Sequence, residues 1–407
     1  MSHANDIYQG VSEQEFAHWK QVAQQVADRL ASTLQTRDRA NQHPFEEIDW
    51  LRQSGLLKLA VPKSLGGGGV DLVQALEISR IISAADGSLG QLIAYHYSNG
   101  VWSYILGNRM QWEFIARGIV EHGWFQSSIS NPRDPRLKLE WDGDDVLVSG
   151  RRTFATGAAV SQVMTIAVWI DDQLVQYQVT ADQPGIRFND DWDNLGQRLT
   201  ASGTLDFDRV RLRPQDRLTG LEQNPASAVL RNALRNQFSQ LIFVHFYLGI
   251  AEGALKQAAH YFRTSVRPWP ESGVEQALDD PYHRLKAGEL ASELAAGIAL
   301  AEKTARTYQA AFHAGNALTE AQWGELALLT DQAKVIANNV ALKISHELFE
   351  LTGGRSTDNR YGLDVYWRNV RTHTLHDPVS YRIREVGDYV LTGKLPTPRV
   401  YAPPKKA

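Results

Sequence analysis

The sequence predicts an α+β protein in which a helical domain, a β domain and a second helical domain follow one another. Apolar residues recur every three or four positions up to about residue 122 and alternate along short runs from 123 to 225. They return to the helical period from 226 onward. Helices and strands in separate blocks favour α+β over a doubly wound sheet. No G-x-G-x-x-G motif follows a strand, so a Rossmann site is not expected.

The first domain, residues 1–122, is expected to be entirely helical. Ser12 and Glu15 form a capping-box pattern ahead of apolar residues that step by three and four, namely Phe16, Trp19, Ala23, Val26, Leu30 and Leu34. Four glycines at 66–69 lack the Lys-Ser/Thr pair that follows a phosphate loop. They are therefore interpreted as a flexible turn before a helix that Asp71 caps.

The second domain, residues 123–225, is expected to be a compact antiparallel β domain of the barrel type. Its apolar runs are β-branched or alternating, and Asp-Gly, Asp-Asp and Pro-Gly pairs separate them. Strands are predicted within or close to residues 124–130, 145–150, 163–170, 174–181 and 204–212.

The third domain, residues 226–407, is expected to be a four-helix bundle, with helices near 228–265, 282–312 and 320–351 and a last one from Asp364 onward. That last segment carries two histidines, His373 and His376, before Asp377-Pro378. Asp377 is interpreted as an N-cap and Pro378 as the first residue of a further helix. His376 is therefore expected at a break between helices, where a titratable imidazole is a candidate site.

Composition excludes several classes of function. The 407 residues carry a formal net charge of −4 with a pI of about 6.3, so nothing indicates a nucleic-acid partner. There is no cysteine, which excludes thiolate chemistry and suits a reducing, cytoplasmic location. No signal peptide is visible, and the longest apolar run, 241–250, is too short to span a membrane. His373, His376 and Asp377 make a poor chelator, so no metal is expected.

Several motifs resemble the acyl-CoA dehydrogenase superfamily, and the resemblance extends over nearly the whole chain. They are LLKLAVPKSLGGGG (56–69), ISAADGSLG (82–90) and LGQRLTASGTLDFDRVRL (195–212). A second set is similar to the dibenzothiophene monooxygenases, a flavin-dependent branch of that superfamily: NDDW (189–192), LIFVHFYLGIAEGAL (241–255), DPYHR (280–284) and RYGLDVYWRNVRTHTLHDPVSY (360–381). The resemblance implies the three-domain fold and a homotetramer assembled through the bundle.

The resemblance also implies a chemistry. Members of this branch take reduced FMN (FMNH2) from a separate flavin reductase, add O2 to form a C4a-hydroperoxyflavin, and pass one oxygen atom to the sulfur of a small apolar substrate. Dehydrogenases of the superfamily instead use a glutamate base in a Tyr-Glu-Gly-Thr-like motif. Here the corresponding place reads Leu375-His376-Asp377-Pro378, so an imidazole stands where that carboxylate would be. Histidine donates or accepts protons near neutral pH.

By the same resemblance, three residues are expected to be catalytic: His376, Thr156 and Tyr95. The flavin is expected to contact Tyr95, Ser128, Ile129, Ser130, Asn131, Arg133, Arg152, Phe154, Thr156, Arg284, Gly354, Arg355 and His376. The substrate is expected to contact Gln91, Trp192 and Phe246. The chain departs from the family at Gln91, where the family has a histidine, and Arg284 lies one position before the family's arginine. These differences indicate a changed pocket.

Two alternatives stay open from the sequence alone. The first is an FAD-dependent acyl-CoA dehydrogenase, in which Asp377 would have to be the base. The second is a non-catalytic flavin-binding module that kept the fold, because fold alone does not imply function.

Overall fold

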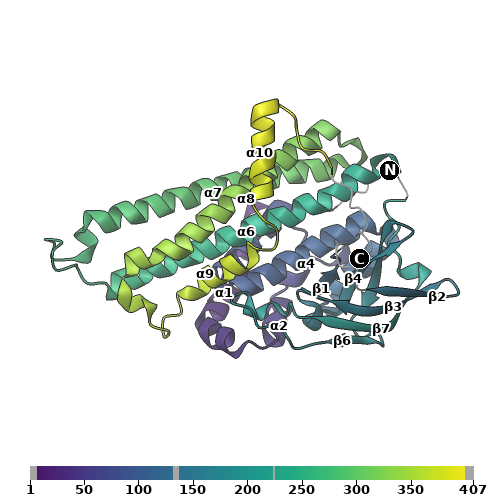
Figure 1. Cartoon of the computed structure of the whole chain (residues 1–407), viewed down its shortest axis with the longest axis horizontal. Coiled ribbons are helices and arrows are strands. Elements are labelled where there is room, and N and C mark those ends of the chain that lie inside the picture. Colours follow the sequence, from purple (N-terminus) through teal and green to yellow (C-terminus); the bar gives the residue numbers. More distant parts are fainter. Residues whose placement is uncertain (1–6, 132–136, 223–224, 399–407) are drawn as a thin grey trace.

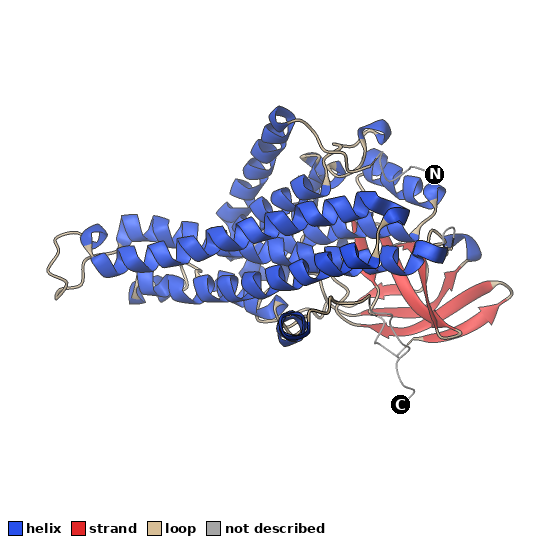
Figure 2. Ribbon diagram, turned by 90° about the horizontal axis from the view of Figure 1, so that it is seen from above, coloured by secondary structure: helices blue, strands red, loops and turns tan. Residues whose placement is uncertain are grey.

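The computed structural model of the chain describes residues 7–131, 137–222 and 225–398. Three long helices run side by side along the molecule, and shorter helices lie beneath them (Figure 1). Seen from above, all the strands lie at one end, next to one end of the long helices (Figure 2). The order of helices, strands and helices confirms the predicted fold class.

The N-terminal part consists of α1 (Glu13–Ala40), α2 (Phe45–Gln53), α3 (Leu72–Ala85), α4 (Gly87–Leu106) and α5 (Arg109–His122). The Ser12 hydroxyl accepts a hydrogen bond from Glu15 N and caps α1. Asp71 and Gln74 form a reciprocal capping box at α3, which confirms the predicted start of that helix. The glycine turn is packed rather than loose, because a Cβ at Gly67 would lie 2.1 Å from the carbonyl oxygen of Val61.

The β part contains two sheets. One has the order β1 (Gln126–Ile129), β4 (Val163–Ile170), β5 (Gln173–Thr180). The other has the order β2 (Lys138–Asp142), β3 (Asp145–Arg152), β7 (Leu205–Leu212), β6 (Ile186–Phe188). All described pairs are antiparallel except β1 with β4, which is parallel. The strand order places β1 at an edge of its sheet, so one row of its backbone groups has no strand partner among the described residues.

The C-terminal part is the bundle: α6 (Pro225–Ser265), α7 (Pro281–Ala314), α8 (Glu320–Thr352), α9 (Asp364–His373) and α10 (Ser380–Thr392). By length and composition α6 passes as a membrane span, yet 78% of its most apolar window is buried inside the protein. It is the central helix of the largest hydrophobic cluster, which also takes in residues of α4, α7, α8 and α9.

The chain breaks between α9 and α10, as predicted, and His376 lies in that break. The predicted capping role of Asp377 is wrong. The first residue of α10 is Ser380, and the residue before it, Val379, makes no side-chain cap. The Asp377 carboxylate lies instead 3.6 Å from Lys334 Nζ and 3.4 Å from Arg382 Nη2. The carboxylate interacts more strongly with these two cations than with the backbone N–H groups at the start of α10.

Candidate active site

A cleft of about 1580 Å³ opens between the bundle, α4 and the β part. Single small-molecule sites usually measure roughly 300–1,000 Å³, so this volume suits a cofactor together with a substrate. The lining comes from both helical parts and from the β part. The helical parts contribute α4, α6, the first turns of α8, and the segment from α9 through α10 to residue 397; the β part contributes β1, the loop after β3 and the loop before β7.

Most of the predicted site residues meet in this cleft. Its lining includes Gln91, Tyr95, Ser128, Ile129, Ser130, Asn131, Arg152, Phe154, Thr156, Trp192 and His376. Phe246 does not line it: the ring is fully buried and packs edge-on against His373 with centroids 4.6 Å apart. The prediction for Phe246 is therefore corrected to a residue that supports the site from behind. Arg133 lies outside the described residues.

Three predicted cofactor contacts are also absent from the cleft lining of the single chain. Arg284 is exposed near the start of α7, where it pairs with Asp279 at 3.1 Å. Gly354 and Arg355 are exposed just after α8.

One face of α4 supplies a wall of the cleft. Gln91, Tyr95, Ser98, Asn99 and Trp102 follow the helical spacing, so their side chains lie along one stripe. α4 is fixed at its start by Asp86, whose buried carboxylate accepts hydrogen bonds from the backbone N–H groups of residues 88 and 89. The rigid helix thereby holds the stripe in place.

The loops of the β part supply hydroxyls and aromatic rings. The Thr156 hydroxyl lies 2.8 Å from that of Ser202, which lies 2.7 Å from that of Thr200, so Thr156 belongs to a chain of hydroxyls at the cleft wall. Phe154 has a φ of 56° and is exposed; its ring lies edge-on to Trp192 with centroids 6.1 Å apart. A left-handed backbone at an aromatic residue is strained, a feature that clusters at functional sites.

Two stacked imidazoles form the bundle wall of the cleft. The rings of His373 and His376 are 4° from parallel with centroids 5.3 Å apart, and Phe243 packs edge-on against both. The side chain of His376 is 54% exposed, whereas His373 is buried. Burial lowers the pKa of His373 well below its ordinary value, so its ring is neutral at physiological pH.

Asp377 is a poor candidate for a base. Burial raises the pKa of its carboxyl, but the neighbouring His376 ring and the charges of Lys334 and Arg382 outweigh burial. The net pKa lies well below the ordinary value. A carboxylate held so strongly in its charged form has little affinity for a proton.

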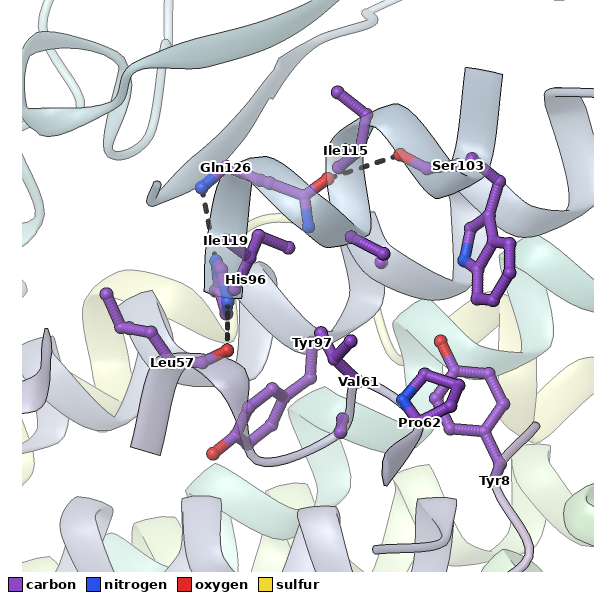
Figure 3. A pocket seen from close by; sticks show the side chains of 14 residues that line it. Tyr8, Leu57, Val61, Pro62, His96, Tyr97, Ser103, Ile115, Ile119 and Gln126 are labelled. Carbon is purple, nitrogen blue, oxygen red and sulfur yellow. Dashed lines mark hydrogen bonds between the residues drawn. The ribbon is translucent and has the colours of Figure 1, made fainter. Parts of the chain in front are cut away.

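β1 is anchored from behind by a buried histidine beside a second, much smaller cavity of about 30 Å³ (Figure 3). His96 Nδ1 accepts from Gln126 N at 3.1 Å, so its Nε2–H donates to the carbonyl of Leu57 at 2.8 Å. Burial lowers the pKa of His96 to about 4, which keeps the ring neutral. The cavity has room for about one water molecule and not for a cofactor.

Replacing His96 by phenylalanine is expected to lower the free energy of unfolding by about 1–3 kcal/mol, because Gln126 N and the Leu57 carbonyl lose their shared partner in a buried place. FMN affinity is expected to fall as well, since Gln126 begins the strand that carries Ser128 to the cleft. Chemical denaturation and flavin fluorescence titration measure the two effects. An unchanged stability would contradict the anchoring role.

The residues of the cleft fit an FMN. Within the described part of the chain, Gln91 Oε1, Gln197 Oε1 and Trp102 Nε1 are buried without a protein hydrogen-bond partner, and all three residues line the cleft. Buried polar atoms of this kind call for a polar ligand. Arg371, Arg384 and Lys394 also line the cleft and supply positive charge for a phosphate.

Comparison with known proteins agrees with this geometry. The family model for the acyl-CoA dehydrogenase N-terminal domain matches residues 12–121, and the model for the C-terminal domain matches residues 241–381. The chain therefore belongs to the acyl-CoA dehydrogenase family, as its motifs predicted.

Within that family the chain is similar to monooxygenases. It is 39% identical to a dibenzothiophene monooxygenase of Mycolicibacterium goodii, covering 93% of this chain and 94% of the relative. It is 35% identical to a probable FMNH2-dependent monooxygenase, SfnC, of Pseudomonas putida, covering 94% and 96%. A crystal structure of TdsC from Paenibacillus sp. A11-2 with FMN and indole matches with a TM-score of 0.88 at 34% identity, covering 94% and 99%.

Sequence reasoning missed the buried groups behind the histidines. Lys334 lines up in α8 with Ala327, Thr330, Ala337 and Ala341, all of them buried, so a lysine stands at a core position. That lysine in an otherwise apolar stripe was the signal in the sequence. Tyr247 gave no comparable signal, because a tyrosine in an apolar helix is ordinary core.

Proposed function

We propose that the protein is a two-component, FMNH2-dependent monooxygenase that oxygenates a small apolar substrate at sulfur. When bound, FMNH2 would supply two electrons and two protons to O2, so that one oxygen atom goes to the substrate sulfur and the other leaves as water. A separate flavin reductase supplies the FMNH2, and the absence of cysteine supports a cytoplasmic setting. Relatives named for dibenzothiophene and FMNH2 support the proposal at 39% and 35% identity.

The observation that carries the proposal concerns two neighbouring side chains of the cleft: an imidazole that is accessible, and a carboxylate that is held in its charged form and cannot act as a base. His376 is open to the cleft, whereas Asp377 is held by Lys334 and Arg382. Thioester dehydrogenation needs a carboxylate base, so the alternative of an acyl-CoA dehydrogenase is disfavoured. An imidazole has one nitrogen that can donate a proton and one that can accept a proton, which suits oxygen transfer.

Each part of the cleft has a proposed task. His376, Thr156 and Tyr95 hold and move protons, while Ser128 to Asn131 and Arg152 orient the flavin ring. The aromatic residues Phe154, Trp192, Trp102, Phe243 and Trp323 line the cleft and exclude water from an apolar substrate. Water exclusion matters because reduced flavin and O2 otherwise release hydrogen peroxide.

The direct test supplies the purified protein with photoreduced FMN, O2 and either a thioether or dibenzothiophene. The expected product is the sulfoxide, with less than one peroxide released per flavin oxidised. An aliphatic acyl-CoA with FAD is the comparison. Bleaching of bound FAD by the acyl-CoA, with no sulfoxide from any organosulfur compound, would overturn the proposal. Tight FMNH2 binding with neither product would favour a non-catalytic module.

The proposal includes a homotetramer in which a neighbouring chain completes each flavin site. The exposure of Arg284, Gly354 and Arg355 away from the chain's own cleft supports this arrangement, because arginine binds phosphate bidentately. His376 comes from the cleft of the same chain whether or not a neighbouring chain contributes to the site.

Subunit mixing tests the shared site. His376→Ala and Arg355→Ala are each expected to be inactive alone, but mixing and reassembling them should restore activity at about one quarter of the sites, since a two-fold interface pairs an intact His376 with a neighbour's intact Arg355. Product formation per flavin measures the recovery. Mixed oligomers that stay inactive would show that Arg355 acts on its own chain or not at all.

A further inference from the structure

A fully buried lysine lies behind the stacked histidines. The side chain of Lys334 is 1% exposed, and its Nζ lies 3.4 Å from the hydroxyl of Tyr247 and 3.6 Å from Asp377 Oδ1. The ammonium also lies over the rings of Phe243 and Tyr247, 4.4 and 4.7 Å from their centroids. Burying a charge is costly unless it is paired, and an apolar residue would fill this place at less cost. The cost points to a task for the charge.

Hydrogen bonds connect this ammonium to the cleft. The Tyr247 hydroxyl lies 2.8 Å from His373 Nδ1, and the Tyr95 hydroxyl lies 3.0 Å from His373 Nε2. Lys334 and Tyr247 are closed off from the cleft, whereas Tyr95 lines it. These four side chains form what we call the relay: Lys334, Tyr247, His373 and Tyr95.

The ammonium sets the direction of donation. An ammonium has donors only, so the oxygen of Tyr247 accepts from Lys334 and its proton goes onward. That proton meets His373 Nδ1 at 2.8 Å, or the His373 carbonyl at 3.1 Å, which already accepts from the backbone N–H of residue 376. The nearby positive charge also makes the tyrosine oxygen a poor acceptor for a second N–H. Nδ1 is therefore the favoured acceptor.

The same direction of hydrogen-bond donation continues from His373 to Tyr95 at the cleft. A neutral imidazole that accepts at Nδ1 carries its proton on Nε2, so His373 donates to the oxygen of Tyr95. The hydroxyl proton of Tyr95 is left free to be donated to a group in the cleft. A neutral lysine would allow the opposite order, in which Tyr247 donates to the lysine nitrogen and Tyr95 donates inward to Nε2.

We propose that the Lys334 ammonium is a positioning group that fixes the direction of donation along the relay, so that Tyr95 presents its proton to the flavin cleft. The inference rests on the proposed function, because it assigns Tyr95 as a proton donor during oxygen transfer. Lys334 keeps its own proton: it orients the hydroxyl of Tyr247 and does not react.

The protonation of Lys334 gives the relay a pH dependence. Burial lowers the pKa of Lys334 to about 8, while Asp377 and Asp331 oppose that shift and Arg382 adds to it. The lysine is thus charged below about pH 8, where the relay points to the cleft, and loses its charge as pH rises through that value. The titratable and charged groups around it come from α6, α8, α9, α10 and the α9–α10 loop: Tyr247, Asp331, His373, His376, Asp377 and Arg382.

The test begins with bound oxidised FMN, whose absorbance responds to hydrogen bonds at the ring. Between about pH 6.5 and 9.5 the wild type is expected to show one spectral transition near pH 8, and Lys334→Met is expected to lack it. In single turnovers with FMNH2 and O2, Lys334→Met is expected to lower the ratio of sulfoxide to peroxide at least about tenfold at pH 7 and to lose the fall above pH 8. Lys343→Met changes a half-buried lysine of the same helix that pairs with Glu289 and Glu293 and does not line the cleft. This control should match the wild type in both.

Tyr247→Phe interrupts the relay at a second place. It is expected to lose the spectral transition and to lower the ratio of sulfoxide to peroxide in the same way, so the inference stays testable if Lys334→Met misfolds. A transition that survives in either folded variant overturns it, as does a wild type with no transition in this range. Wild-type protein that yields only peroxide from every organosulfur compound refutes the proposed function instead, and the spectral transition still decides the relay.

Discussion

Replacing His376 by alanine is expected to reduce coupled oxygenation by a factor of about 10²–10⁴, the usual contribution of a general acid or base. The imidazole is open to the cleft, stacked on the neutral ring of His373 and 3.9 Å from Asp377 Oδ1. The carboxylate lies on the Nδ1 side of the ring, too far for a hydrogen bond, so Nε2 is left for exchange with a bound group. Without the His376 imidazole, FMNH2 and O2 should yield mainly hydrogen peroxide.

A pair of variants separates proton chemistry from packing. His376→Phe keeps a ring that stacks on His373 but has no nitrogen, so its oxygenation is expected to be as low as that of His376→Ala. His18→Ala removes an exposed histidine on α1 and serves as the control. Sulfoxide and peroxide are measured per flavin oxidised, with FMN affinity measured in parallel. Undiminished oxygenation in either His376 variant would remove the imidazole from the mechanism.

The fold was predictable because the spacing of apolar residues differs between the helical parts and the β part of the chain. The period of 3.6 up to residue 122 and the alternation afterwards are local signals, and the predicted helices and strands begin and end close to observed ones. The short strands β2 and β6 and the helix α5 were not predicted. The parallel pairing of β1 with β4 was not predictable in this way. Nothing local distinguishes an edge strand that pairs parallel from one that pairs antiparallel, because the pairing depends on where the connecting chain runs.

The sequence could predict candidate site residues where they lie in segments that resemble the family. Tyr95, Thr156 and His376 are such residues, and all three line the cleft. The failure at Asp377 has a physical reason. An Asp-Pro pair is a cap signal only if no stronger partner is near. Here Arg382 lies in α10 itself, five residues after Asp377, and Lys334 comes from α8. The long-range pair with Lys334 leaves no trace in local spacing, so it appears only once the bundle is assembled.

Asp86→Ala is expected to lower the free energy of unfolding by about 3–5 kcal/mol, the cost of leaving one partner of a buried ion pair uncompensated. The carboxylate is fully buried and lies 2.7 Å from Arg37 Nη1, whose side chain is 12% exposed. Its other oxygen caps α4 through the N–H groups of Ser88 and Leu89, at 2.9 and 3.1 Å. Because α4 carries Gln91 and Tyr95, looser FMN binding is expected as well.

Asp86→Asn divides the two roles of the side chain. Its amide oxygen still accepts from the start of α4, while the charge opposite Arg37 is gone, so its loss of stability is expected to be clearly smaller than that of Asp86→Ala. Asp28→Ala, at an exposed position on α1, should stay within about 0.5 kcal/mol of the wild type. Urea unfolding followed by circular dichroism gives all three values. Equal losses for Ala and Asn would mean that the ion pair alone holds α4, and no loss for Ala would mean that neither contact does.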